Sequence, residues 1–166
     1  FTSDNGYSAG EHRWVGKVAP YEEDIRVPLI IRYGPAAAAA ERDIHMVTNV
    51  DLAPTFAELA GVRDVQTEGQ SLLPLLRGSP VAWRDDVMVE AVGGSTVSGY
   101  CLVHDGRFKL VRYVTGEEEL YDLRADPYEL DNRVGDPTHA AAEERLSLRL
   151  RQLCRKIPAV PTTGED

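Results

Sequence analysis

The stretch YCLVHDGRFKLVRY, residues 100–113, decides the fold of the second half of the chain. Two apolar runs, residues 100–104 and 108–113, flank the pair Asp105-Gly106. An Asp-Gly pair between two such runs is a strong signal for a tight hairpin. The stretch therefore predicts two antiparallel strands joined by a short turn.

Neighbouring segments extend this hairpin into a small sheet with one helix. Val87–Val92 and Glu119–Leu123 have the pattern of two further short strands. Asp136-Pro137 is typical of a helix start. The apolar residues that follow are spaced to share one helical face: Leu146, Leu150, Leu153 and Ile157. We expect a small antiparallel sheet with a helix over residues 136–157 packed on it.

The first half of the chain has the pattern of an α/β fold. The run VPLIIRY, residues 27–33, ends at Gly34-Pro35 and predicts a buried strand. Residues 51–61 predict a helix that Asp51 caps and that Gly61 ends in the left-handed region. We expect one apolar face on this helix: Leu52, Phe56, Leu59 and Ala60. A strand followed by a helix indicates the α/β class.

A change of pattern at Gly78-Ser79-Pro80 predicts the domain organisation. Residues 1–78 are expected to belong to a larger α/β domain, and residues 79–157 to form a small α+β subdomain. Residues 158–166 are expected to be a flexible tail. The alanines at 36–40 are expected to form a surface excursion.

Composition excludes several classes of protein. The chain has 166 residues, 43% of them apolar, which suffices for an ordinary core. Its net charge is −9, without a basic stripe, so we expect no nucleic-acid partner. No run of 18 apolar residues is present, so we expect no membrane-spanning segment. Cys101 and Cys154 are expected to be two isolated thiols, although their spacing leaves pairing open.

Asp4-Asn5-Gly6 follows a short apolar start and is a candidate metal site. A carboxylate beside an amide oxygen offers hard ligands that suit Ca²⁺ or Mg²⁺. Calcium takes roughly six to eight oxygens, so further ligands must come from elsewhere. Turn chemistry alone also explains Asp-Asn-Gly, and both interpretations stay open at this point.

Two further polar residues follow in the same loop region. Lys17 offers a point positive charge, and His12 can donate or shuttle a proton, so both suit an anionic ester. The alternative is a solvated loop with an exposed Lys and His. The acidic run at residues 22–24 carries no signal by itself, and Arg26 is expected to pair with one of these acids.

Read together, these pieces closely resemble the C-terminal half of the sulfatase family, within the alkaline-phosphatase-like superfamily. The resemblance covers roughly residues 1–155, and its wording looks most like the glucosamine-6-sulfatase-like branch, which includes many bacterial arylsulfatases. It rests on an ordered series of motifs: FTSDNG at 1–6, GEH at 10–12, GK at 16–17, YE at 21–22, RVPL at 26–29, NVDLAPT at 49–55, GQSLLPLL at 69–76 and ELYDLRADPYELDN at 119–132.

The resemblance implies a sulfuric ester hydrolase with a divalent metal, usually Ca²⁺ and alternatively Mg²⁺ or Mn²⁺. Asp4 and Asn5 match two of the family's four metal ligands, Lys17 matches the lysine that contacts sulfate, and His12 falls at a substrate-pocket position. The family nucleophile is a formylglycine made in a Cys/Ser-x-Pro/Ala-x-Arg motif. Neither Cys101 nor Cys154 begins that motif. The nucleophile and two metal-binding acids are therefore expected in an upstream part, and this chain alone should be inactive.

Three hypotheses follow. The chain is the C-terminal part of a sulfatase, a non-catalytic stand-alone module, or part of a phosphoesterase or phosphonate hydrolase of the same superfamily. Asp4-Asn5 favours the sulfatase, because phosphonate hydrolases usually have Asp-His there. We expect the upstream part of the protein and a sulfate ester as partners, with self-association through residues 27–33 if the chain is isolated. Sulfatases are often secreted, periplasmic or lysosomal, and these residues select no compartment.

Overall fold

A computed structural model describes residues 1–34, 43–62, 65–94 and 96–154, and these form two compact units. Unit 1 comprises Phe1–Asp4 and Pro28–Asp85, and unit 2 comprises Asn5–Val27 and the chain from Asp86 onward. The loop region that follows Asp4 therefore packs with the second half of the chain. The domain organisation expected from the pattern change at residues 78–80 stays a prediction. The expected excursion at 36–40 and the expected tail at 158–166 lie outside the described residues.

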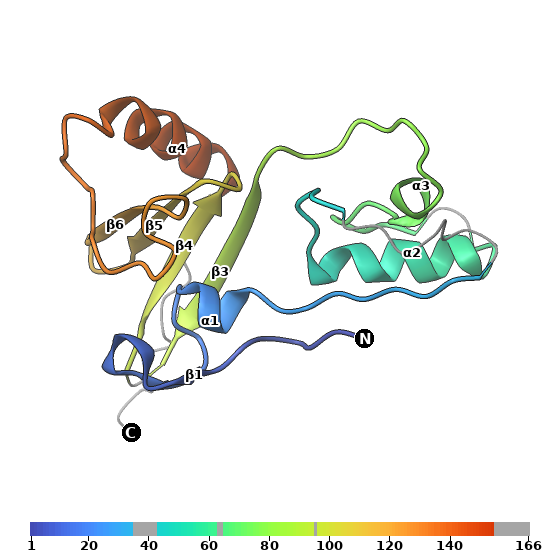
Figure 1. Cartoon of the computed structure of the whole chain (residues 1–166), viewed down its shortest axis with the longest axis horizontal. Coiled ribbons are helices and arrows are strands. Elements are labelled where there is room, and N and C mark those ends of the chain that lie inside the picture. Colours follow the sequence, from blue (N-terminus) through green and yellow to red (C-terminus); the bar gives the residue numbers. More distant parts are fainter. Residues whose placement is uncertain (35–42, 63–64, 95, 155–166) are drawn as a thin grey trace, which may run out of the picture. The chain divides into compact units, whose positions relative to one another are not determined.

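Unit 2 is built on a four-stranded antiparallel sheet (Figure 1). Its strands run in the order in which they occur in the chain: β3 Val87–Gly93, β4 Ser98–His104, β5 Phe108–Tyr113 and β6 Glu118–Asp122. All four strands confirm the sequence prediction. The predicted turn is also present, because the Asp105 carboxylate accepts the N–H groups of Arg107 and Phe108, and Gly106 has a φ of 89°.

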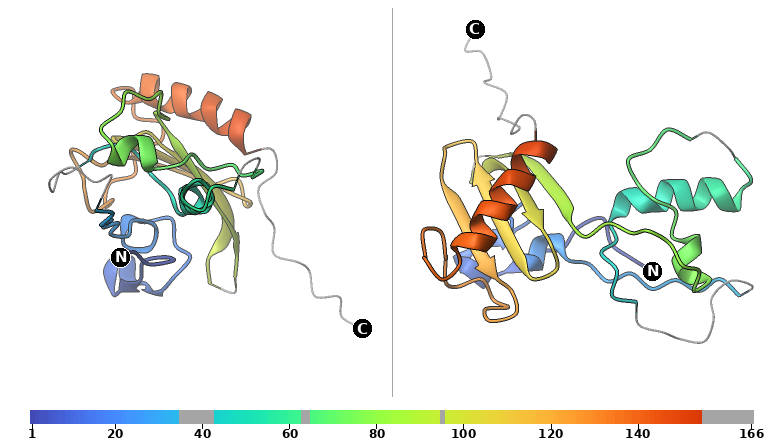
Figure 2. Two further views of the ribbon diagram at one scale, coloured as in Figure 1. Left: turned by 90° about the vertical axis from the view of Figure 1, so that its right-hand side faces the viewer. Right: turned by 90° about the horizontal axis from the view of Figure 1, so that it is seen from above.

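Helix α4, Ala140–Leu153, covers one face of this sheet (Figure 2). Leu146 and Leu150 are buried there, as predicted, against the side chains that β4, β5 and β6 direct to that face: Cys101, Val103, Leu110 and Leu120. The helix begins at residue 140 rather than 136 because Asp136 closes a turn, accepting both the N–H and the hydroxyl of Thr138. The expected last face residue, Ile157, lies outside the described range. None of the helices in the described ranges has the length and apolar character needed to cross a membrane.

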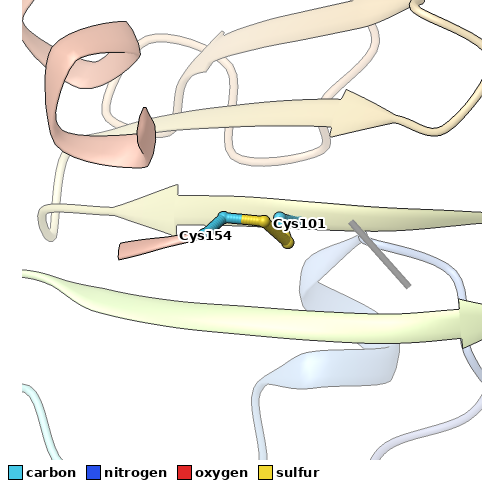
Figure 3. The surroundings of a disulfide bond; sticks show 2 residues. All are labelled: Cys101 and Cys154. Atoms are coloured by element: carbon cyan, nitrogen blue, oxygen red, sulfur yellow. A yellow bond between two sulfur atoms is a disulfide. The ribbon is translucent and has the colours of Figure 1, made fainter. Parts of the chain in front are cut away.

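Cys101 and Cys154 form a disulfide that joins β4 to the residue after α4 (Figure 3). The expectation of two isolated thiols is therefore wrong. The two Cα atoms are 6.3 Å apart although the cysteines are 53 positions apart in sequence. Packing of α4 on the sheet brings them together, and the residue spacing contains no sign of that packing.

The opposite face of the sheet is covered by the N-terminal segment of unit 2 (Figure 1). Ile25 packs there against the buried side chains of Tyr100, Leu102 and Val111. The segment contains three short elements and one 3₁₀ turn: β1 Ser8–Ala9, the turn Glu11–Arg13, β2 Val15–Gly16 and α1 Glu22–Ile25. Strands β1 and β2 pair antiparallel, with Ser8 opposite Gly16.

Unit 1 contains α2, Leu52–Leu59, which follows a 3₁₀ turn at Asn49–Asp51, and α3, Leu73–Leu76. Gly61 ends α2 with a φ of 70°, as predicted. Asp51 does not cap α2, because its buried carboxylate already accepts hydrogen bonds from other groups, among them the Thr48 hydroxyl. The closest donors are the N–H groups of Thr48 and Gln70 and the two terminal nitrogens of Arg84. Burial acts to raise the pKa of Asp51, but these donors outweigh it and hold the pKa below its ordinary value.

Two apolar features of unit 1 differ from the prediction. Residues 27–33 form no strand, and Ile30 is 63% exposed, although it exchanges two backbone hydrogen bonds with Phe1. The expected face of α2 is also open, with Phe56 63% and Leu59 40% exposed, while Thr55 is the residue buried. Both segments have the composition of core elements, and the described residues do not cover them.

The disulfide leads to a test of stability. Cross-linking residues 53 positions apart stabilises the folded state by about 4 kcal/mol in the chain-entropy model. We therefore expect the paired substitution Cys101→Ser/Cys154→Ser to lower the free energy of unfolding of unit 2 by about 4 kcal/mol. Chemical denaturation measures this change. Non-reducing peptide mapping should recover the two cysteine peptides as one species. Two titratable free thiols in the native, unreduced protein would contradict the structure.

Candidate active site

The loop that carries His12 and Lys17 begins at Gly6, which is packed against α1. A Cβ atom at Gly6 would lie 1.8 Å from the Glu23 carbonyl oxygen, so only glycine fits. The Gly6 N–H donates to the carbonyl of Asp24 at 2.7 Å, and the Tyr7 N–H donates to that of Glu23 at 2.9 Å. The glycine of the Asp-Asn-Gly motif thus attaches the site loop to α1.

Asn5 and Lys17 are brought together by this loop. Lys17 Nζ lies 3.5 Å from Asn5 Oδ1, although twelve positions separate the residues in sequence. The Asn5 amide nitrogen donates to the Gly6 carbonyl at 2.6 Å, so the amide oxygen is the atom that faces Lys17. A neutral amide oxygen and a positive charge therefore lie side by side in unit 2.

Asp4 belongs to unit 1 and is held there through its backbone. The Asn49 side chain donates to the Asp4 carbonyl at 2.8 Å and approaches the Ser3 carbonyl at 3.5 Å. The Ser3 hydroxyl approaches the Asp4 carboxylate at 3.3 Å, and the Asp4 side chain is exposed. The carboxylate is thus on the surface, directly before Asn5 in the chain.

His12 lies in different surroundings from those expected for a substrate contact. Its ring stacks on Tyr21 with centroids 3.6 Å apart and planes 6° apart, and its Nε2 is 3.8 Å from a Glu23 carboxylate oxygen. The side chain is only 11% exposed. Its described partners are therefore Glu23 on α1 and Tyr21, which directly precedes α1. The assignment of His12 as a catalytic residue stays a prediction.

A buried ion-pair network lies on the sheet face that α1 covers. Lys109 is fully buried on β5, where it contacts the Glu129 carboxylate and lies 3.5 Å from that of Glu22. The Glu22 N–H donates to the Glu129 carboxylate at 2.7 Å, and His104 Nε2 lies 3.6 Å from Glu22. Burial lowers the pKa of His104, although Glu22 opposes this effect.

Tyrosines surround a second carboxylate on the same face. Burial raises the pKa of Glu119, although the hydroxyl of Tyr121, 3.2 Å away, opposes this effect. Burial also raises the pKa of Tyr21 to about 12, and that of Tyr113 and Tyr121 above their ordinary value. These phenols stay protonated at neutral pH, so none of them acts as a base, and the Tyr121 hydroxyl donates to Glu119.

One group of side chains in this network has the residue types of a metal site. His12, Glu23 and Glu129 each offer a ligand atom, and these atoms lie within 4.8 Å of one another. The Lys109 ammonium already contacts Glu129 and supplies the cation that these acids need. A metal there would meet a buried like charge, so the group is better explained as part of the structural network.

Sequence reasoning missed this network. The acidic run at 22–24 carried no signal by itself, and only the expected pair of Arg26 is confirmed, at 3.8 Å from Glu22. A signal was nevertheless present. Residues 109 and 111 share one face of β5, and Val111 is apolar, so a lysine at 109 points into a buried face. A buried lysine requires a carboxylate partner.

Known proteins share the sequence and the fold of this chain. The family model for the C-terminal region of N-sulphoglucosamine sulphohydrolase matches residues 10–156. The chain is similar to the N-acetylglucosamine-6-O-sulfatase of Bacteroides thetaiotaomicron, with 36% identity over 92% of this chain and 29% of that protein.

Two solved structures are also similar to this chain in fold and sequence. One, in complex with its substrate D-glucosamine-2-N,6-O-disulfate, has 34% identity and a TM-score of 0.80 over 91% of this chain and 32% of that one. The phosphonate monoester hydrolase of Agrobacterium radiobacter has 31% identity and a TM-score of 0.75 over 92% and 35%. The chain thus spans about a third of the length of each relative.

The predicted class and fold are thereby confirmed. The chain has the α/β fold of the C-terminal portion of an alkaline-phosphatase-like sulfatase, with a small antiparallel sheet and a C-terminal helix. It belongs to the N-sulphoglucosamine sulphohydrolase C-terminal family.

The buried network has a direct stability test. Lys109→Met leaves the Glu129 carboxylate buried without its cation, which should cost about 3–5 kcal/mol. Adding Glu129→Gln removes that charge and keeps an acceptor for the Glu22 N–H, so the double variant should recover most of the loss. Urea denaturation measures both. Arg145→Met, at an exposed pair with Asp105, is the control and should cost less than about 1 kcal/mol. A double variant no more stable than Lys109→Met would contradict the assignment.

Proposed function

We propose that this chain is the C-terminal part of a sulfatase that hydrolyses aryl or sugar sulfate esters. The observation that carries the proposal is the approach of Lys17 Nζ to Asn5 Oδ1, on a chain similar to sulfatases along nearly its whole length. An ammonium beside an oxygen that can bind a metal suits a sulfate monoester. The ammonium and the bound metal would both carry positive charge, and both would stabilise the same anion.

Asp4 and Asn5 are the proposed metal ligands of this chain. Their carboxylate and amide oxygens are hard donors, which fits Ca²⁺ and also Mg²⁺ or Mn²⁺. When bound, the metal supplies Lewis-acid stabilisation of the sulfate oxygens. Within this chain, Lys17 binds and orients the sulfate through its ammonium, and the Asn5 side chain holds its oxygen toward the same side. His12 is proposed as a contact or acid for the leaving group.

The nucleophile is proposed to lie upstream of this chain, as a formylglycine. Supporting this, Cys101 and Cys154 bond to each other, and neither is followed by the residues of the modification motif. On this proposal the 166-residue chain alone has no turnover.

Turnover of the complete protein tests these roles. Asp4→Ala and Lys17→Ala should each lower the release of an aryl sulfate by about 10²–10³, because each removes a group that stabilises developing charge. Adding EDTA should abolish activity if the metal is required. Unchanged turnover in both variants would contradict the site assignment, and turnover by the 166-residue chain alone would contradict an upstream nucleophile.

A phosphonate hydrolase of the same superfamily is the second candidate, favoured by the similarity to the Agrobacterium radiobacter enzyme. Asp4-Asn5 argues for the sulfatase instead, because a neutral amide stands where phosphonate hydrolases usually have a histidine. Comparing kcat/KM for an aryl sulfate and an aryl phosphonate distinguishes the two.

The proposed partner of unit 1 is the upstream part of the same protein. Supporting this, three large apolar side chains that suit a core are open to solvent: Ile30, Phe56 and Leu59. Expressed alone, the chain should self-associate through this surface, and Phe56→Ser/Leu59→Ser should reduce that association. Light scattering of the purified chain measures the effect. A monodisperse monomer with unchanged behaviour in the variant would contradict this prediction.

A further inference from the structure

The loop between Gly6 and Ala19 holds backbone conformations that its residues disfavour. Val18 has a φ of 84°, which is a clear outlier for a β-branched residue, and His12 and Arg13 have φ values of 52° and 57°. Such conformations cost free energy and persist only where surrounding contacts impose them. Val18 directly follows Lys17, so whatever holds Val18 also sets the direction of Lys17.

Both ends of the loop are held by one side chain, that of Asp24 on α1. Its Oδ1 accepts the hydroxyl of Ser8 at 2.6 Å, and its Oδ2 accepts the N–H of Ala19 at 2.7 Å. Its own carbonyl accepts the N–H of Gly6. Asp24 is 3% exposed and Ser8 is fully buried, so water does not compete for these bonds.

Lys17 therefore lies between two fixed points. On one side, Gly16 ends β2, opposite the same Ser8 whose hydroxyl binds Asp24. On the other side, Ala19 is bound to Asp24 directly. Only Lys17 and Val18 lie between these anchors. Release of Ala19 would leave Val18, whose φ of 84° is disfavoured, without the hydrogen bond that follows it directly in the chain.

We propose that Asp24 is a positioning residue for the sulfate contact of Lys17. The proposal rests on the function proposed above for Lys17. Asp24 acts through the loop: its carboxylate closes the loop at Ser8 and Ala19 and thereby fixes where the ammonium lies relative to Asn5 Oδ1.

A mutant cycle in the complete protein tests this role, with an aryl sulfate as the probe. Asp24→Ala should lower kcat/KM about 10- to 100-fold. This loss should be smaller than the loss caused by Lys17→Ala. Asp24→Asn should stay within about three-fold of the unmodified protein, because its amide accepts from Ala19 and donates to the Ser8 hydroxyl. In a Lys17→Ala background, Asp24→Ala should cost almost nothing more, because the group it positions is gone.

A residue that only stabilises the fold would behave differently in this cycle. Asp122→Ala is the control, since Asp122 is also buried in unit 2 but binds Arg107 instead of the loop. Its effect on kcat/KM should be equal with and without Lys17. If Asp24→Ala yields no folded protein, Ser8→Ala removes one of the two bonds and should give a smaller loss, again only when Lys17 is present.

The outcomes separate the two proposals. A normal loss for Lys17→Ala, combined with an Asp24→Ala loss that is equal in both backgrounds, overturns the positioning role alone. An Asp24→Ala enzyme with unchanged kcat/KM overturns it as well. An unchanged Lys17→Ala enzyme overturns the function proposed for Lys17 and, with it, this proposal.

Discussion

Unit 2 depends on the ion pairs that the fully buried ammonium of Lys109 makes. The ammonium stands on the sheet face opposite α4 and contacts carboxylates from two distant segments, Glu22 on α1 and Glu129 after β6. A charge in this position is tolerated only with such partners, since its desolvation is otherwise prohibitive. The sheet therefore requires α1, and the N-terminal segment of unit 2 is held on the sheet by charge as well as by the packing of Ile25.

The Lys109 ion pairs support the candidate site through two successive sets of contacts. Lys109 holds α1 on the sheet, and α1 in turn holds the site loop through the backbone of Glu23 and Asp24 and through the Asp24 carboxylate. The loop then brings Lys17 to Asn5. The chemistry proposed for an anionic ester thus depends on a rigid support that contains none of the reacting groups, an arrangement expected where charges must be preorganised.

Local patterns could be predicted from the sequence, and long-range partners could not. The hairpin around Asp105-Gly106 depends on neighbouring residues, and the structure confirms it. The motif series from Phe1 to Asn132 predicted the family, which the comparisons confirm. The disulfide, the Lys109 network and the Asp51–Arg84 pair join residues that only the tertiary fold brings together. Residues 27–33 failed as a strand for the related reason that a strand needs a partner, which no local pattern supplies.

On the proposed function, this chain contributes a metal-binding pair and a sulfate-binding lysine to a sulfatase site. A crystal structure of the complete protein with sulfate and Ca²⁺ tests this most directly. We expect the metal on the oxygens of Asp4 and Asn5, and a sulfate oxygen within hydrogen-bond distance of Lys17 Nζ. Sulfate bound away from Lys17, or a metal coordinated without Asp4 and Asn5, would contradict it.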